Sequence, residues 1–299
     1  MKYLYYPGCS LKCSGRAYEE SLLPVFRAVG AALDELPDWN CCGATSYMSV
    51  NEESAFSLAL RNLCLAERHG GMDGAPVDLV APCAACYLVL NKAQHHLADY
   101  PQASQRMLDR FGTAGLRYAG RVRVRHPLDV LLNDVGLDAV RAQVRRPLLG
   151  LKVACYYGCQ LVRPYATFDD QHRPTTMDRL MIALGAQPVD WPLKTRCCGG
   201  TLTGTIQDVG LRLNELLLDE AKRRGADAVA TACPLCQFNL ECQESREAPR
   251  EGGRGRLPIT YFTQLVGLAF GIPERELGLQ RSLVPVQPAL AALEGAHHA

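Results

Sequence analysis

The stretch from Trp191 to Gly200 reads WPLKTRCCGG, and it contains two adjacent cysteines followed by glycine. The same string occurs earlier as Cys41-Cys42-Gly43. An Asp-Trp dipeptide precedes both copies, at Asp38-Trp39 and at Asp190-Trp191. Two copies of so specific a string indicate an internal duplication, which predicts two structurally similar halves.

Further cysteines flank each copy at matching positions. A Gly-Cys dipeptide lies upstream and a Cys-x-x-Cys motif lies downstream of each vicinal pair. The flanking cysteines recur 150 residues later and the vicinal pair recurs 156 residues later. Each half therefore carries five cysteines in one pattern: Cys9, Cys41, Cys42, Cys83 and Cys86, then Cys159, Cys197, Cys198, Cys233 and Cys236.

The bulk composition narrows the class of protein. The chain has 299 residues and a net charge of +1, which gives no sign of nucleic-acid binding or of a membrane-surface protein. The start of the chain lacks the pattern of a signal peptide, and the most apolar run, 265–272, is too short to span a bilayer. We therefore expect a cytoplasmic protein without a transmembrane segment. In that reducing compartment, 14 cysteines indicate metal or redox chemistry rather than structural disulfides.

Strand-like and helix-like segments alternate in both halves, which predicts an α/β fold. The expected strands are 2–6, 32–36 and 77–81, then 151–154, 187–190 and 227–231. The expected helices include 14–29, 51–70, 175–184 and 206–224, with Pro24 giving a kink or a late start in the first. We expect two tandem pseudo-symmetric domains, 1–146 and 147–299, each a small parallel sheet flanked by helices; the second would also carry a C-terminal helix and tail.

The cysteines of each half follow the carboxyl ends of three expected strands. In a parallel sheet these ends lie along one rim, so residues far apart in the sequence meet there. We therefore expect one cysteine-rich site at the rim of each sheet.

Five cysteines are one more than a tetrahedral zinc site takes. Adjacent cysteines in extended backbone also point in different directions, which suits a cluster with several irons. The glycines after each pair allow close backbone approach, and Arg196 or Lys194 could offset the negative charge of the thiolates. Zinc remains an alternative, as does a strained vicinal disulfide at Cys41-Cys42.

Four cysteines have no counterpart in the other half. Cys64 lies on an expected apolar helix face with Phe56 and Leu60, which favours core packing. Cys242 is also expected to be structural, whereas the roles of Cys13 and Cys155 stay open because they lie close to Cys9 and Cys159.

Three other segments carry weaker signals. Seven arginines make the segment around the expected domain boundary basic: Arg117, Arg121, Arg123, Arg125, Arg141, Arg145 and Arg146. Either a solvated surface or the docking of an acidic partner would account for them. Residues 244–256 are expected to form a flexible loop, and 284–299 a tail without a site signal.

The chain resembles the CCG-domain iron–sulfur family, specifically the B subunit of heterodisulfide reductase with its bacterial relatives, including the sulfur-oxidising ones. The resemblance includes the opening at Tyr5-Tyr6-Pro7-Gly8-Cys9 and the closing segment 261–271. It implies that each half binds a noncubane [4Fe-4S] cluster through its five cysteines, one of which bridges irons. The ten paired cysteines would be the ligands, with none missing.

The resemblance also implies a function. The chain would be the catalytic subunit of an oxidoreductase complex, in which a disulfide is reduced, or a thiol or sulfane sulfur oxidised, between the two clusters. The substrate could also reside on a lipoate-type carrier protein. The alternative is an electron-relay subunit of a succinate, glycolate or lactate flavin dehydrogenase complex. The chain has no ferredoxin cysteine run and no flavin fingerprint, so the expected partners are a ferredoxin-like iron–sulfur subunit (of the C type) together with a flavoprotein subunit (of the A type).

Overall fold

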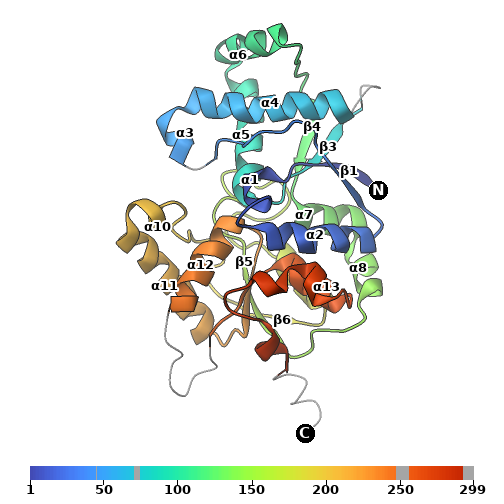
Figure 1. The fold of residues 1–299 in the computed structure, drawn as a ribbon, viewed down its shortest axis with the longest axis vertical. Coiled ribbons are helices and arrows are strands. Elements are labelled where there is room, and N and C mark those ends of the chain that lie inside the picture. The colour runs from blue at the N-terminus through green and yellow to red at the C-terminus, as the bar shows by residue number, and fades with distance from the viewer. Residues whose placement is uncertain (45, 71–74, 247–255, 292–299) are drawn as a thin grey trace.

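Two four-stranded parallel sheets form the framework of the protein (Figure 1). The computed structural model describes residues 1–44, 46–70, 75–246 and 256–291. The spatial strand orders are β2-β1-β3-β4 and β6-β5-β7-β8, so each strand of the first sheet has a counterpart in the second. The predicted α/β fold with two tandem, flanked parallel sheets is confirmed, and both sheets have the same topology.

The first sheet is built from short strands joined by helical connections. Its strands are β1 (Lys2–Tyr5), β2 (Ala32–Glu35), β3 (Val77–Val80) and β4 (Val122–Arg125). The helices are α1 (Gly8–Leu11), α2 (Arg16–Ala28), α3 (Ser46–Val50), α4 (Glu52–Gly70), α5 (Ala84–Asp99), α6 (Pro101–Thr113), α7 (Pro127–Asp129), the π-helix η1 (Val130–Val135) and α8 (Leu137–Gln143).

The second sheet repeats the arrangement. Its strands are β5 (Lys152–Tyr156), β6 (Gln187–Pro188), β7 (Ala228–Thr231) and β8 (Ile259–Tyr261). The helices are α9 (Thr176–Ala183), α10 (Leu202–Thr205), α11 (Gln207–Arg223), α12 (Pro234–Arg246), α13 (Phe262–Ala269) and two 3-10 turns, η2 (Glu274–Leu277) and η3 (Leu279–Arg281).

The two halves share a continuous hydrophobic core, because each lends a helix to the other. Helix α2 of the first half packs against α13 of the second, and α9 of the second packs against α7 and α8 of the first. The ring of Tyr18 stacks on that of Tyr261 with centroids 4.5 Å apart. Beside this stack, the buried hydroxyls of Ser21 and Thr263 are hydrogen-bonded at 2.6 Å. This exchange places the carboxyl-end rims of the two sheets close to each other.

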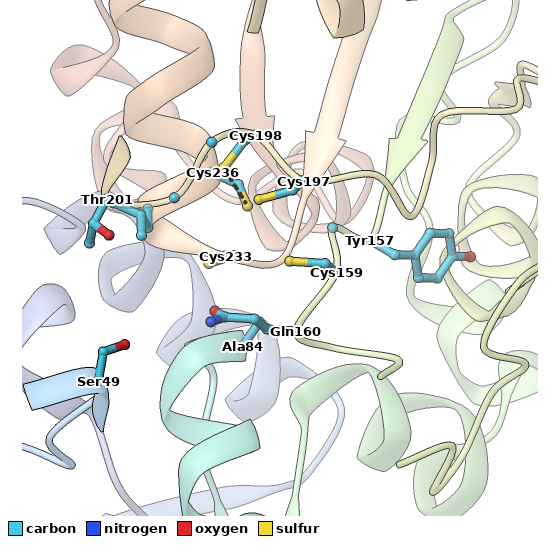
Figure 2. A pocket seen from close by; sticks show the side chains of 14 residues that line it. Ser49, Ala84, Tyr157, Cys159, Gln160, Cys197, Cys198, Thr201, Cys233 and Cys236 are labelled. Carbon is cyan, nitrogen blue, oxygen red and sulfur yellow. Dashed lines mark hydrogen bonds between the residues drawn. The ribbon is translucent and has the colours of Figure 1, made fainter. Parts of the chain in front are cut away.

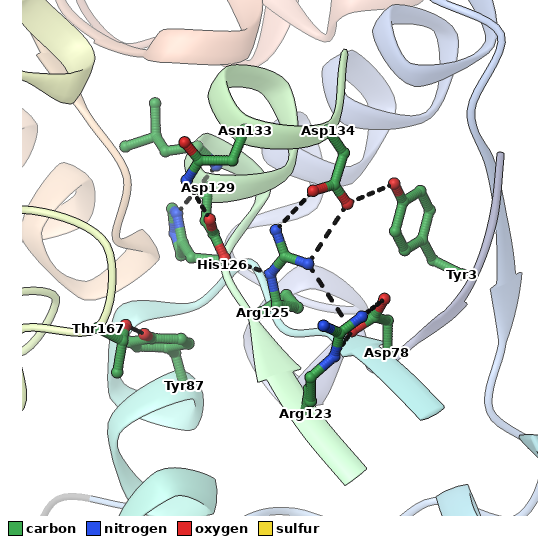
Figure 3. Close-up of polar contacts among 11 residues, drawn as sticks. Tyr3, Asp78, Tyr87, Arg123, Arg125, His126, Asp129, Asn133, Asp134 and Thr167 are labelled. Carbon is green, nitrogen blue, oxygen red and sulfur yellow. Dashed lines mark hydrogen bonds and ion pairs between the residues drawn. The ribbon is translucent and has the colours of Figure 1, made fainter. Parts of the chain in front are cut away.

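The fourth strand of each sheet was not predicted. Strand β4 contains Arg123 and Arg125, which the sequence placed in a basic connector. Figure 3 shows that both arginines pair with carboxylates of their own chain. Arg123 forms a bidentate pair with Asp78 at 2.7 and 2.8 Å, and Arg125 binds Asp129 and Asp134. The side chain of Arg125 is only 13% exposed, so at this position a solvated surface is the wrong interpretation.

The four expected helices are all present, as α2, α4, α9 and α11, but some of their expected details are wrong. The expected apolar face of α4, with Phe56, Leu60 and Cys64, is buried as predicted. Helix α2 begins at Arg16 and continues through Pro24, so it does not start late. The expected helix 206–224 is present as α11, and near its start Ile206 and Val209 are 58% and 48% exposed. The expected loop 244–256 is wrong at its start, because residues 244–246 belong to α12. The rest of that segment, 247–255, and the end of the tail, 292–299, lie outside the described residues.

Candidate functional site

Four of the five cysteines of the first half meet as two pairs of sulfurs. Cys9 lies in α1, which follows β1 in the chain. Its Sγ is 3.9 Å from Sγ of Cys41, which follows β2. Sγ of Cys42 is 3.3 Å from Sγ of Cys86, in the first turn of α5 behind β3. Both distances exceed the ~2.05 Å of a disulfide, so the thiols are free. The adjacent Cys41 and Cys42 therefore face different partners, as the sequence predicted.

The second half repeats this geometry (Figure 2). Sγ of Cys198 lies 3.4 Å from Sγ of the buried Cys236. The thiols of Cys159 and Cys197 also interact, as those of Cys9 and Cys41 do in the first half. We call the five cysteines of the first half the first site and those of the second half the second site.

The remaining cysteine of each half joins the two sites. Cys83 precedes α5 and Cys233 precedes α12, and both are buried. Their side chains interact across the boundary between the halves, and this contact with Cys233 is the main cause that lowers the pKa of Cys83. The two cysteine-rich rims therefore form one composite centre.

The more exposed member of each vicinal pair is the one that ionises most readily. The thiols of Cys42 and Cys9 lower the pKa of Cys41 to about 2, and the backbone N–H of Gly43 adds to the effect. The thiols of Cys159 and Cys198 likewise lower the pKa of Cys197 to about 2. Because a thiolate is the form of cysteine that binds metals, each site carries a ligand prepared for binding.

The glycine before the first cysteine of each site leaves room for a sulfur. At Gly8, with φ +68°, a Cβ would lie 2.9 Å from Sγ of Cys86. At Gly158, with φ +69°, a Cβ would lie 3.3 Å from Sγ of Cys236. Both the positive φ and the close approach require glycine, which explains the repeated Gly-Cys dipeptide.

Two tyrosines that sequence reasoning missed fix the vicinal pairs. The hydroxyl of Tyr6 donates to the carbonyl oxygen of Asn40, directly before Cys41, at 2.7 Å. The hydroxyl of Tyr156 donates to the carbonyl oxygen of Arg196, directly before Cys197, at the same distance. The two tyrosines are 150 residues apart, like the flanking cysteines, so the repeat itself carried the signal.

Two buried asparagines support the same loops from neighbouring helices. In α4, Nδ2 of Asn62 donates to the carbonyl oxygen of Asn40 at 2.9 Å, and Oδ1 of Asn62 accepts from the backbone N–H of Asn40 at 3.0 Å. In α12, Nδ2 of Asn239 donates to the carbonyl oxygen of Gly200 at 2.9 Å. These asparagines do not occupy equivalent positions, so the duplication gave no indication of them.

His126 connects the Cys-x-x-Cys loops of the two halves. It is fully buried, and its Nε2 lies 3.0 Å from the carbonyl oxygen of Pro82, next to Cys83. It also interacts with the carbonyl of Ala232, next to Cys233. Its Nδ1 accepts from the N–H of Leu128 at 3.2 Å. Burial lowers the pKa of His126 to about 4, so the ring is neutral near pH 7.

A cavity of about 250 Å³ opens at the second site. Its wall includes Cys159, Cys197 and Cys233 from the second half, together with Ser49 and Ala84 from the first. Figure 2 shows these groups around one space. The cavity thus extends across the boundary between the halves and contacts both rims.

The ten cysteine sulfurs and the buried hydroxyl of Tyr18 indicate whether a prosthetic group fits at these rims. Ten sulfurs gather at the two rims, and soft thiolates are the usual ligands of iron–sulfur clusters. The hydroxyl of Tyr18 is buried and has no hydrogen-bond partner among the described residues. Burial raises the pKa of Tyr18 and the nearby thiols of Cys83 and Cys233 raise it further, which places the ring beside both rims. The residues therefore fit an iron–sulfur group.

No three side chains of Cys, His, Asp or Glu in the described ranges have the spacing of ligands around a single metal ion. The other four cysteines stand apart from the sites. Cys64 and Cys155 are fully buried in α4 and β5, Cys242 is half-buried in α12, and Cys13 is exposed. None of the contacts made by the described residues joins any of these four to another sulfur.

A family profile described as a cysteine-rich domain, CCG, matches the chain twice, over residues 3–91 and 153–241. The chain belongs to the CCG family. The matches cover the CCG strings and Cys-x-x-Cys motifs of both halves, and the sequence-based identification is confirmed. Within the described part of the chain, no helix combines the length and apolarity that crossing a membrane requires.

Relatives of this CCG protein match along most of its length. A protein of Archaeoglobus profundus, described as like the B subunit of heterodisulfide reductase, is 29% identical, over 93% of this chain and 94% of its own. The B subunit of the ferredoxin/F(420)H(2)-dependent CoB-CoM heterodisulfide reductase of Methanosarcina acetivorans is 29% identical, over 84% and 83%. The 8-methylmenaquinol:fumarate reductase membrane anchor subunit of Wolinella succinogenes is 29% identical, over 95% and 97%.

A solved structure of a hypothetical protein from Helicobacter pylori has the same fold. It superimposes with a TM-score of 0.72 at 13% identity, over 95% of this chain. This chain spans about half (52%) of the Helicobacter pylori chain.

Proposed function

We propose that this CCG protein is the iron–sulfur catalytic subunit of a heterodisulfide reductase-like complex. It would reduce a disulfide, or oxidise a thiol or sulfane sulfur, in the space between the first and second sites. The observation that carries the proposal is the interaction between Cys83 and Cys233, because it joins the two five-cysteine sets next to a cavity that the second site lines and that Ser49 and Ala84 of the first half close. The relatives named after the B subunit of heterodisulfide reductase support the assignment.

We propose the ten paired cysteines as the ligands of two noncubane [4Fe-4S] clusters. Breaking a disulfide takes two electrons, and a bound iron–sulfur cluster usually supplies one. The protein's own part is to hold two such groups on either side of one substrate. Tyr6 and Tyr156 fix the vicinal pairs, while His126 couples the two Cys-x-x-Cys loops.

The proposal includes partners and a location. Electrons would enter from, or leave to, a flavoprotein and a ferredoxin-like iron–sulfur subunit, in the cytoplasm. The disulfide or thiol could be a small molecule or could be carried on a lipoate-type protein.

A second function is favoured by one specific observation. The Wolinella succinogenes relative, which is named as part of a fumarate reductase, matches over 95% of this chain. On that basis the chain would be an electron-relay subunit of a flavin dehydrogenase complex. A relay has no need of a cavity at its cluster sites, and the cavity at the second site favours the catalytic role.

Metal analysis tests the cofactor. Anaerobically purified protein should contain ~8 Fe per chain and equal acid-labile sulfide. Zinc at one or two per chain without sulfide would contradict the cluster assignment.

Paired variants test the catalytic role. Cys42→Ala and Cys198→Ala each disable one site, and EPR should show that the other cluster survives. In a reconstituted complex, we expect disulfide reduction to be almost abolished by either variant, because each sulfur of the substrate needs its own electron donor. Half the wild-type rate from either variant would mean two independent sites, and the paired arrangement would be wrong.

A further inference from the structure

The first and second sites are not electrostatically equal, and the difference is one arginine. Arg163 lies one turn after Cys159, where its backbone N–H donates to the carbonyl oxygen of Cys159 at 3.2 Å. Its guanidinium donates to the carbonyl oxygen of Thr195, two residues before Cys197. The side chain thus spans the two loops that carry the outer cysteines of the second site.

The positive charge of Arg163 is not cancelled locally. Its hydrogen-bond acceptor at Thr195 is a neutral carbonyl, and no carboxylate in the described ranges forms an ion pair with it. The residue is half-buried, so water screens its charge only in part. Through this contact with Thr195, the guanidinium lies at the loop that carries Cys197.

At the equivalent position, the first site lacks a cation. The position equivalent to Arg163, 150 residues earlier, is the uncharged Cys13. Lys12, next to it, is bound by the carboxylates of Glu19 at 2.6 Å and Glu35 at 2.7 Å.

The other basic groups near these sites do not reverse the difference. Arg61, behind the first site, is bound by the carboxylate of Asp38 at 2.5 Å. Lys194, which the sequence suggested as a counter-charge for the second site, is bound by the carboxylate of Asp178 at 2.8 Å. Arg196 precedes Cys197 but is exposed, so its charge is screened by solvent. Arg163 is therefore the distinguishing charge.

We propose that Arg163 makes the two sites redox-unequal, so that the group at the second site accepts an electron at a higher potential than the group at the first. The inference rests on the proposed function, since it requires both sites to hold iron–sulfur groups. Reduction adds a negative charge, and a nearby cation stabilises that charge most where the dielectric is low. An electron supplied by an iron–sulfur partner then settles first at the second site.

An EPR-monitored titration with dithionite as reductant tests the inference on the anaerobically purified chain. The wild type should show two midpoint potentials. Arg163→Gln should lower the higher midpoint by at least a tenfold change in the one-electron equilibrium, which corresponds to about 59 mV. Arg163→Lys keeps the charge and should retain most of the wild-type value. Arg173→Gln removes an exposed arginine from the same loop and should leave both midpoints unchanged.

Single-site proteins assign the midpoints. Cys42→Ala leaves the second site and Cys198→Ala leaves the first, and the second site should have the higher midpoint. If Arg163→Gln loses iron, the inference is tested by comparing the midpoint potentials of the two single-site proteins. A lower midpoint at the second site than at the first would overturn it. An unshifted midpoint in an iron-replete Arg163→Gln protein would also overturn it, while leaving the proposed function intact. A wild-type protein without iron and sulfide would instead refute the proposed function.

Discussion

Replacing Gly210 with alanine tests how closely the second site is packed. Alanine in place of glycine normally stabilises a helix by about 1 kcal/mol. In α11, however, the new Cβ would lie 2.5 Å from the backbone N and 2.7 Å from Cα of Thr203 in α10. Gly210 is also packed against Gly199 of the vicinal-pair loop, since a Cβ on Gly199 would lie 3.0 Å from Cα of Gly210. Both obstacles are backbone atoms, so they cannot rotate away.

Overpacking of this kind costs about 1–3 kcal/mol. We therefore expect Gly210→Ala to lower the free energy of unfolding by about 1 kcal/mol net and to weaken iron retention at the second site. The matched control is Gly112→Ala in α6, where no described atom beyond the adjacent residues and the helix's own backbone lies within 4 Å of the new Cβ. This control should gain about 0.5–1 kcal/mol.

Urea denaturation of the iron-free proteins, with the m-value checked for constancy, measures both changes. Iron analysis of the iron-loaded proteins gives the second readout. If Gly210→Ala stabilises the protein as much as Gly112→Ala does, the close contact between α11 and the α10 loop does not exist and our account of the second site is wrong.

Three further predictions follow from the two sites. Iron analysis should show that Cys41→Ser loses or alters a cluster. Cys64→Ser, on the buried face of α4, should keep its iron and lose about 1–3 kcal/mol of stability. Equal iron loss from both variants would refute the proposed ligand set. The isolated chain should not turn over with NADH, and steady turnover in a spectrophotometric assay would exclude the need for partners. The third prediction concerns pH. Because the pKa of His126 is about 4 when folded and about 6.5 when unfolded, the unfolded chain binds more protons between these values. Stability should therefore fall by about 3 kcal/mol as the pH drops from 6.5 to 4, and His126→Gln should flatten this slope in urea titrations.

The arrangement of cysteines along each rim was predictable because it follows from the strand order. A parallel sheet brings the ends of its strands together, whatever the separation in sequence. The residues that support the loops were not predictable in the same way. Asn62 and Asn239 come from helices that are not equivalent in the two halves. His126 follows β4, whose alternating valines and arginines were interpreted as part of a basic segment and not as a strand.

Charges were the least predictable part of the site. Lys194 lies near Cys197 in the sequence, yet its ammonium group is held by Asp178 from α9. Arg163 lies far from Cys197 in the sequence but reaches its loop through a carbonyl contact. Which cation remains unpaired depends on the tertiary contacts of every carboxylate nearby, and a sequence pattern does not contain that information.

The exchange of helices between the halves bears on how the two copies pack together. Helix α2 buries Tyr18, Leu22 and Phe26 against partners that include α13, which belongs to the other copy. A single copy would leave that apolar face open and would hold only one cysteine set. Two identical copies exchanging these helices would close both faces through a self-complementary, twofold interface. The two halves therefore pack as the subunits of a twofold dimer do, with the two cysteine-rich rims at the shared interface. Covalent linkage within one chain removes the requirement that equivalent positions be identical, so one position is Cys13 in the first half and Arg163 in the second.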